Sequence, residues 1–329
     1  MLGRRVFLEA AGGTALAAFA GVTGAGATGA AARLGPSAGA GLPAADASDR
    51  PRYCIFSKHL PDLGWTDLAA ATIDMGFDGI DLTVRAKGHV LPERVTEDLP
   101  RALDAIRAKG TTVSMITTEV TSADQPEARA IFAAAGKAGI RLAKVGYWKY
   151  ALEDVRAEVA AMGRDLAGLA ALAKQHGVTI GVHNHQGNLG SALWDIAPQI
   201  DPLDPTAIGY YFDPRHAFAE GGGVGWKAAT LLVAPRTKMI AVKDMFWEKG
   251  PKGWTIQSCP MGEGMLDWGW FSTALARSSY AGPISVHLEY KIPGTTPEEI
   301  RRNTMTAATR DLAFTKRHIA AAREAEVRR

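Results

Sequence analysis

Apolar, strand-like segments alternate with amphipathic, helix-like segments from residue 53 to the C-terminus. The strand-like segments lie at 53–58, 79–84, 111–118, 142–147, 178–185, 208–213, 239–244 and 284–289. Strands that alternate with helices build a parallel sheet, and eight such units predict a closed (β/α)8 TIM barrel in one domain. An open doubly wound sheet is the alternative, but no Gly-rich phosphate turn follows the first strand.

Helical periodicity and Gly or Pro punctuation place the intervening helices. The first begins near Trp65, the next six lie near 97–109, 125–138, 152–176, 191–199, 226–233 and 268–278, and the last opens at Pro297. We expect a long loop after the seventh strand, and Trp247 and Cys259 lie within it.

Each of the last four strand-like segments ends in polar side chains. Side chains alternate across a strand, so every second residue shares a face, and all strand C-termini of a closed barrel meet at one rim. The positions predicted to face the barrel mouth are His183 and His185, Tyr211 and Asp213, Lys243, and His287 and Glu289. Four such endings in succession predict an active site at this rim.

These side chains offer imidazole, carboxylate and ammonium groups to one pocket. Imidazole and carboxylate suit a borderline divalent cation such as Mn²⁺, Zn²⁺, Co²⁺ or Ni²⁺, which polarises a carbonyl or hydroxyl group. Asp213 either caps the following turn or serves the site. His216 is expected to orient Asp213 and is also a candidate substrate-binding residue. We assign Lys243 to a substrate oxyanion, and either His185 or Glu289 to proton transfer.

Aromatic and acidic residues of the loops complete the predicted site. Trp148 and Trp247 follow strand ends and are candidates for sugar stacking. Glu263 lies between two glycines and is a candidate substrate-binding carboxylate. Asp81, inside the second strand, is interpreted as a buried structural acid.

The N-terminus carries an export pattern. Arg4 and Arg5 precede a mildly apolar, Ala/Gly-rich stretch, which is typical of a twin-arginine signal peptide. We assign residues 1–27 to this signal, 28–50 to a disordered linker and 51–329 to the barrel. The chain is therefore expected to be exported to the periplasm or the outside, without stable membrane insertion once the signal is cleaved.

Charge and cysteine content indicate which kinds of binding partner the chain has. The formal net charge is +3, from 37 basic and 34 acidic residues that are dispersed along the chain, so no basic stripe suits a nucleic-acid backbone. Two cysteines, Cys54 and Cys259, set no disulfide framework. The expected partner is a small molecule, and the sequence predicts no particular oligomeric state.

Several motifs resemble one family. His183-Asn184-His185-Gln186-Gly187-Asn188, Phe212-Asp213-Pro214-Arg215-His216, Val242-Lys243-Asp244 and 282–290 (GPISVHLEY) are similar to the sugar phosphate isomerase/epimerase superfamily. The resemblance runs from about Tyr53 to the last helix and implies a xylose-isomerase-like TIM barrel. Its members include ketose 3-epimerases, hydroxypyruvate isomerase, inosose dehydratase, glycoside eliminases and endonuclease IV.

The resemblance also implies a metal site with an altered ligand set. The family's Glu, Asp, His and Glu ligands correspond here to His183, Asp213, Ala241 and His287, so only the aspartate matches in kind. His183, Asp213 and His287 remain the candidate ligands, with Glu289 or His185 completing the shell.

The resemblance and the rim residues together predict an enzyme that removes a proton next to a sugar carbonyl. Sugar isomerisation or epimerisation is the first interpretation. A sugar or cyclitol dehydratase or β-eliminating lyase on the same barrel is the second, and a noncatalytic carbohydrate-binding barrel is the third. An endonuclease would need a richer metal set and a basic groove.

Overall fold

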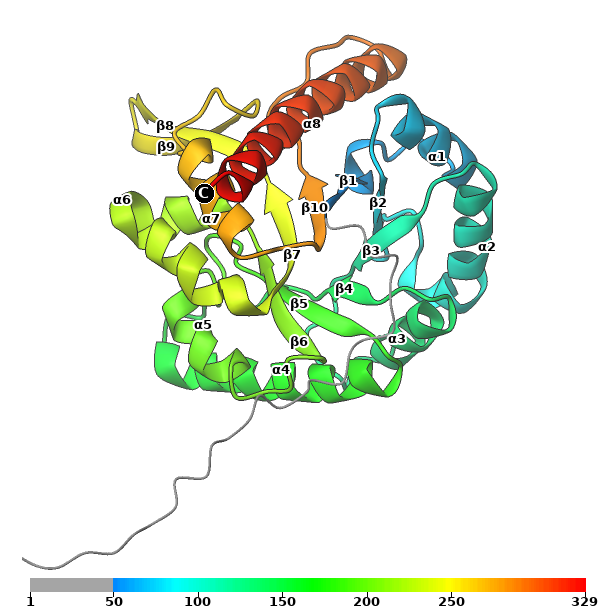
Figure 1. Ribbon diagram of the computed structural model, residues 1–329. Helices are drawn as coiled ribbons and strands as arrows, with labels where there is room; N and C mark the ends of the chain where they lie inside the picture. The colour runs from blue at the N-terminus through cyan, green and yellow to red at the C-terminus, as the bar shows by residue number, and fades with distance from the viewer. Residues whose placement is uncertain (1–49) are drawn as a thin grey trace, which may run out of the picture. The chain divides into compact units, whose positions relative to one another are not determined.

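The computed structural model describes residues 50–329, and eight of its strands close into a parallel barrel (Figure 1). Their spatial order is β1-β10-β7-β6-β5-β4-β3-β2. They are β1 (Arg52–Phe56), β2 (Gly79–Thr83), β3 (Val113–Thr117), β4 (Leu142–Lys144), β5 (Thr179–His183), β6 (Ile208–Phe212), β7 (Thr237–Val242) and β10 (Pro283–Val286). The predicted (β/α)8 barrel is confirmed.

Helices form a ring around the strands (Figure 1). They are α1 (Trp65–Asp74), α2 (Val95–Ala108), α3 (Ala128–Lys137), α4 (Val155–Gln175), α5 (Leu193–Ile200), α6 (Pro214–Val233), α7 (Trp268–Arg277) and α8 (Pro297–Val327), with 3-10 turns at Ser57–His59, Pro92–Arg94 and Ala234–Arg236. Each helix packs an apolar stripe on the barrel; α2, for example, buries Leu99, Leu103 and Ile106 at helical spacing.

The barrel interior below the mouth is filled by side chains. Met115, Tyr211, Met239 and Ala241 form a buried cluster on the inward face. Gly181 belongs to the same layer, because a Cβ there would lie 2.0 Å from Cε of Met239. This packing leaves the C-terminal ends of the strands as the place where polar side chains gather.

Helix α6 begins much earlier than the sequence predicts. It starts at Pro214, directly after β6, rather than near Trp226. The side chain of Asp213 caps its first turn and Pro214 takes the first helical position, where proline is favoured. Gly222 and Gly223 have non-helical φ/ψ values, so α6 consists of two helical segments joined at a kink, and the helix predicted at 226–233 lies in the second segment.

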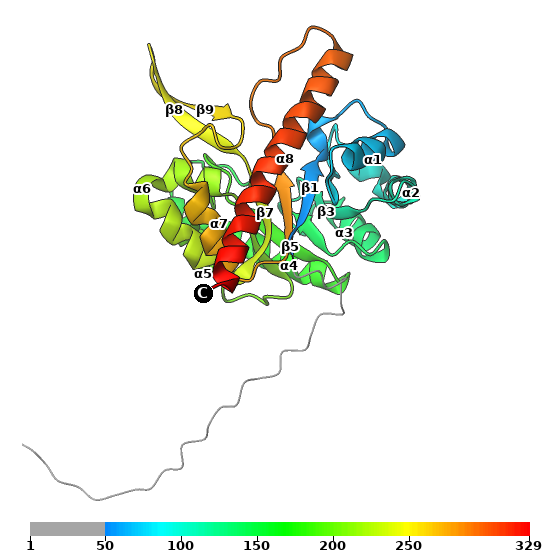
Figure 2. The same ribbon diagram turned by 45° about the horizontal axis from the view of Figure 1, so that its top comes forward.

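The predicted long loop after β7 is instead a β-hairpin. Strands β8 (Asp244–Gly250) and β9 (Gly253–Cys259) pair antiparallel, and Figure 2 shows them projecting from the barrel. Asp244 fixes the base of the hairpin, because its Oδ2 accepts hydrogen bonds from the backbone N–H groups of Gly262 and Gly264 and from Nε1 of Trp268. Asp244 therefore pairs with neighbours away from the inward-facing side chains.

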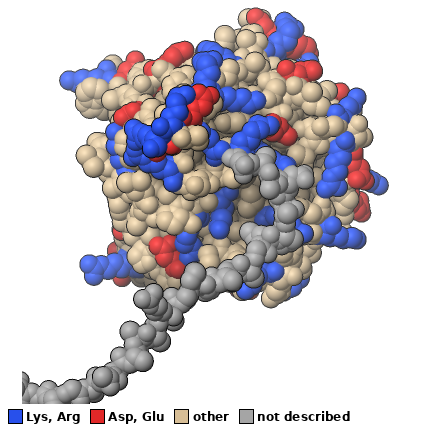
Figure 3. Space-filling model, in the orientation of Figure 1, with Lys and Arg blue, Asp and Glu red and all other residues tan. Residues whose placement is uncertain are grey.

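The described residues contain no helix that is both long and apolar enough to cross a membrane. On the face shown in Figure 3, basic and acidic side chains are interspersed. The predicted signal peptide and linker lie outside the described residues, apart from Arg50. Cys54 and Cys259 are both free and buried.

Candidate active site

Asp213 stands at the centre of a buried polar cluster at the barrel mouth. Its Oδ2 lies 3.2 Å from Nε2 of His183, 3.1 Å from Nζ of Lys243 and 3.7 Å from Nε2 of His216. All four side chains are buried. Strands β5, β6 and β7 and the first turn of α6 thus bring their polar groups to one oxygen.

The local sequence fixes Asp213 in this position. Its backbone N–H donates to Oδ1 of Asn184 over 2.8 Å, and its carbonyl oxygen accepts from Nδ2 of the same side chain over 3.0 Å. Its Oδ1 caps α6 by accepting from the backbone N–H of His216 over 3.1 Å. One carboxylate oxygen therefore caps the helix, as one of the two interpretations predicts, while the other faces the polar cluster.

Glu289 forms the outer edge of the cluster. Its Oε1 lies 2.7 Å from Nζ of Lys58, 3.7 Å from Nδ1 of His287 and 3.9 Å from Nζ of Lys243. The Glu289 side chain is 29% exposed, whereas that of Lys243 is 4% exposed. Lys243 thus links a buried carboxylate, Asp213, with one that reaches solvent.

Burial sets the charge states of the cluster. It lowers the pKa values of His183 and His216 well below the usual value, so both rings are neutral near pH 7. Burial also raises the pKa of Asp213, but the Lys243 ammonium and the two histidines outweigh it and hold that pKa well below its usual range. Burial also raises the pKa of Glu289, but His287, Lys243 and Lys58 lower it more, so the pKa of this carboxyl group lies below its usual range.

Three side chains of the cluster fit a divalent metal. One ligand atom from each of His183, Asp213 and His216 lies within 4.8 Å of the others, and all three residues are buried. Nε2 of His216 has no hydrogen-bond partner among the described residues. Two neutral imidazoles and an ionised carboxylate suit a borderline ion. Lys243 contacts the same Asp213 oxygen, so its ammonium and such an ion would compete there.

His287, also a predicted ligand, lies beside this group rather than in it. Its Nε2 is 3.1 Å from the Tyr211 hydroxyl, and its ring stacks on Phe56 at a centroid distance of 4.5 Å. The His183 and His287 ring centroids are 6.3 Å apart. The structure therefore brings His287 to the mouth but engages its Nε2 with a tyrosine.

His185 lies on the outer side of the cluster. Its ring centroid is 4.0 Å from that of His216 and 5.8 Å from that of His183. It is less buried than these two rings. His185 is therefore placed where a ligand entering from solvent would meet it.

Three predicted substrate-binding residues make no hydrogen bond, ion pair or ring contact with the cluster in the described part of the chain. The indole Nε1 of Trp148 donates to Asp165 of α4 over 2.9 Å. Trp247 stands on the hairpin and is 37% exposed. Glu263 is exposed and pairs loosely with Arg310, at 3.8 Å. Nothing in these contacts directs the three side chains to the mouth.

Tyr147 and Lys144 belong to the site but were missed in the sequence. The Tyr147 hydroxyl lies 2.8 Å from Nδ1 of His183, and Nζ of Lys144 sits 3.4 Å from the centroid of the Tyr147 ring. Burial, with the charge of Arg85, lowers the pKa of Lys144 to about 7. Lys144 pairs in register with Gly181, so strand alternation extended to β4 would have placed it inward.

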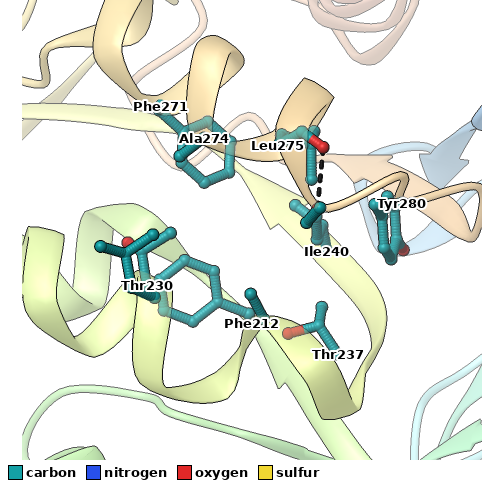
Figure 4. Close-up of a pocket in the computed structure, with 11 residues that line it drawn as sticks. Phe212, Thr230, Thr237, Ile240, Phe271, Ala274, Leu275 and Tyr280 are labelled. Carbon is teal, nitrogen blue, oxygen red and sulfur yellow. Dashed lines mark hydrogen bonds between the residues drawn. The ribbon is translucent and has the colours of Figure 1, made fainter.

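A separate small cavity of about 20 Å³ lies between α6 and α7, on the outer side of β6 and β7 (Figure 4). Phe212, Ile240 and Phe271 line it with apolar side chains. Phe212 precedes Asp213 and has the opposite strand parity, so this cavity is a packing defect between the layers. It carries no polar constellation like that at the mouth.

The protein is a TIM barrel whose ionisable side chains gather at the C-terminal ends of the strands, where TIM-barrel enzymes have their active sites. The chain belongs to the xylose isomerase-like TIM barrel family, whose model matches residues 69–318. No curated protein matches the sequence.

Solved structures share the fold at low identity. A D-psicose 3-epimerase with D-tagatose from Clostridium cellulolyticum H10 has a TM-score of 0.63 and 12% identity, covering 82% of this chain and 99% of that one. A 3-keto-D-glucoside 4-epimerase from E. coli has a TM-score of 0.58 and 13% identity, covering 79% and 99%. A xylose isomerase-like TIM barrel protein from Mycobacterium smegmatis in complex with magnesium has a TM-score of 0.57 and 13% identity, covering 79% and 97%.

Proposed function

We propose that the protein is a sugar isomerase or epimerase that removes a proton from the carbon next to a carbonyl. The observation that carries this proposal is the buried cluster at the mouth, where neutral imidazoles surround the Asp213–Lys243 pair. Proton removal from such a carbon needs a base at the carbon and a positive group at the oxygen. The sugar epimerases with the same fold support a sugar as the substrate.

We propose His183, Asp213 and His216 as the ligands of a divalent metal. When bound, such an ion supplies Lewis acidity at a substrate oxygen. The donor set and the unpartnered Nε2 of His216 support this assignment. Completion of the shell by His185 stays a prediction.

Lys243 is assigned to the substrate oxygen that becomes negative. A cation already held in place by Asp213 and Glu289 needs little reorganisation when that charge develops. His185 and Glu289 are the rim groups that can carry the proton. The depressed pKa of Glu289 makes it the weaker base, which favours His185.

Deuterium incorporation tests the proposed reaction. The purified protein is incubated in D2O with D-psicose, D-tagatose, other free ketoses and 3-keto-D-glucosides, with metal content measured on the same sample. We expect a member of the panel to gain one deuterium at the epimerised or isomerised carbon while its carbon skeleton stays intact. Release of water or of an aglycone would show a lyase instead.

Asp213→Asn tests the metal assignment, because asparagine still caps α6 but lacks the charge. Turnover and bound metal should both fall strongly, whereas the exposed Asp195→Asn on α5 should leave both unchanged. Full turnover by a preparation that contains no metal, after exhaustive chelation, would contradict the metal-assisted reaction.

We also propose export by the twin-arginine route. The support is the Arg4-Arg5 pair and the Ala/Gly-rich stretch that follows it. Export makes a free sugar, cyclitol or glycoside a better substrate than a phosphorylated intermediate of the cytosol.

A further inference from the structure

A cavity of about 550 Å³ adjoins the polar cluster at the barrel mouth. Three parts of the chain line it: the end of β9, the segment that follows β10, and one face of α8. Binding sites for small molecules commonly measure roughly 300–1,000 Å³, so this cavity has room for a ligand group. The residues assigned above to the reaction and to the metal do not line it.

The lining of the cavity continues directly from the polar cluster at two points. Tyr290, which lines the cavity, follows Glu289 in the chain, so the Cα atoms of the two residues are about 3.8 Å apart. Ser258 lines the cavity from β9, and its Oγ lies 3.5 Å from Nη2 of Arg215. Arg215 is buried, precedes His216 in the first turn of α6 and contacts its ring. A group attached to a ligand in the mouth can therefore reach the cavity.

Hydrogen bonds fix the walls of the cavity. The Tyr290 hydroxyl donates to Oδ2 of the buried Asp311 over 2.7 Å, and Nη2 of Arg310 donates to the Tyr290 oxygen over 2.9 Å. Nδ2 of Asn303 donates to the carbonyl oxygen of Pro293 over 2.9 Å. These bonds attach the segment after β10 to α8. The cavity is therefore formed before a ligand enters, and binding requires little ordering of the chain.

The lining combines apolar surface with hydrogen-bonding groups. Ile292, Pro293 and Ala307 contribute C–H groups, whereas Asn303 and Arg310 contribute an amide and a guanidinium group. A sugar ring has the same combination, because its faces carry C–H groups and its edge carries hydroxyl groups. Apolar walls with a few polar groups that fix orientation are typical of small-molecule sites.

We propose that this cavity, the outer subsite, binds a second sugar ring that is joined by a glycosidic bond to the ring in the mouth. The inference rests on the proposed function, because it narrows the substrate of the same site to a glycoside or disaccharide. The first ring carries the carbonyl group and meets the polar cluster, while the second ring lies between α8 and the segment after β10. Contacts with the second ring are remote from the reacting carbon, so they increase affinity and hold the first ring in position for the reaction.

Paired ligands test the outer subsite by binding alone. Calorimetry compares methyl β-D-glucoside with methyl β-D-cellobioside, and D-fructose with lactulose, because the second member of each pair adds one ring to the first. We expect the two-ring member of a pair to bind about tenfold more tightly or better, since the added ring gains apolar contact and hydrogen bonds. Equal binding of both members, or no binding of either, in both pairs would overturn the outer subsite.

Ala307→Trp fills the outer subsite. Ala307 is half-buried on α8 and lines the cavity. In this variant the two-ring ligand should bind no more tightly than the one-ring ligand, whose affinity should stay within about twofold of that of the unaltered protein. Ala133→Trp is the matched control, because Ala133 is also half-buried on a helix and lines a separate cavity between α2 and α3. It should leave both affinities unchanged.

Thr306→Trp gives the same test if Ala307→Trp does not fold, because Thr306 lines the cavity from an exposed position of α8. An equal loss of affinity for one-ring and two-ring ligands in these variants would overturn the outer subsite, since the substitution would then act on the mouth.

Kinetics in D2O separate this inference from the proposed reaction. If one-ring sugars incorporate deuterium with the same kcat/KM as their two-ring counterparts, the isomerase stands and the outer subsite fails. If no sugar incorporates deuterium, but two-ring ligands have an advantage in binding that Ala307→Trp removes, the outer subsite stands and the proposed reaction fails.

Discussion

Asp213 and Glu289 share one cation, and this sharing determines how the mouth behaves. Lys243 lies 3.1 Å from the first carboxylate and 3.9 Å from the second. Burial lowers the pKa of Lys243, while both carboxylates raise it. Removing one member of such a buried set leaves the others uncompensated, so each substitution changes the electrostatics of the whole cluster.

Lys243→Met should lower kcat far more than it raises KM. The methionine keeps the length of the side chain but supplies no charge for the developing oxyanion, so the loss falls on the transition state; we expect a decrease of about 100-fold or more in kcat. Metal affinity should hold or rise, because the competing ammonium is gone.

Lys58→Met is the matched control. Lys58 carries the same charge and contacts Glu289 at 2.7 Å, but its side chain is 31% exposed and it does not reach Asp213. An exposed ion pair contributes little, so the effect on kcat should be small. Equal losses in the two variants would show that Lys243 acts only through Glu289.

Single residues were predictable where strand alternation applied. It placed His183, Asp213 and Lys243 on the inward face, because a strand has a period of two whatever its partners. His216 came from another cause: the early start of α6 turns it back toward Asp213. The aromatic residue that contacts His183 is Tyr147, and alternation did not point to it because β4 ends at Lys144.

At the scale of elements, α6 combines a rigid first turn with a kink. The first turn carries His216 and is capped by Asp213, so the helix start and the site are built from the same groups. The kink has φ +48° and ψ −175° at Gly222. Residues with a Cβ atom rarely adopt this conformation.

Gly222→Ala should therefore destabilise the fold by about 1–3 kcal/mol, through backbone strain alone. A Cβ atom there would meet nothing within 4 Å, so no clash contributes. Gly225→Ala, in the same helix, also meets nothing and has no positive φ, so it should stay within about 1 kcal/mol of the unaltered protein. Urea unfolding measures both, and equal stability of the two variants would contradict the strain argument.

The same element shows where sequence patterns fail. Four glycines among residues 214–225 suppress the helical signal, although the Asp213 cap and Pro214 are themselves signals of a helix start. The hairpin was missed for a different reason. Its alternation is weak, because much of β8 and β9 is exposed on both faces, and neither strand belongs to the barrel.

At the scale of the whole molecule, the barrel was predictable because its signal is repeated eight times. Each strand is a short apolar run, and each helix that follows has an apolar stripe. An error in the bounds of one element therefore does not change the number of βα units. Closure also needs a register between the first and last strands. The structure provides it by pairing Arg52 to Ile55 with Pro283 to Val286. No sequence pattern contains that pairing, and it makes the barrel complete from β1 onward.

A chain shortened to begin at Pro51 should therefore keep its melting temperature. Barrel closure begins at Arg52, and the contact of 3.3 Å between Arg50 and Asp78, which the shortening removes, is exposed and contributes little. A drop of many degrees would show that the removed segment packs on the barrel.

The same shortened chain tests export, because it lacks Arg4 and Arg5. Expressed in a bacterium with a twin-arginine system, the full chain should reach the periplasm, whereas the shortened chain should stay in the cytoplasm with its barrel intact. Replacement of Arg4 and Arg5 by lysines in the full chain separates the motif from the length of the segment, and unimpaired export of that variant would contradict the twin-arginine route.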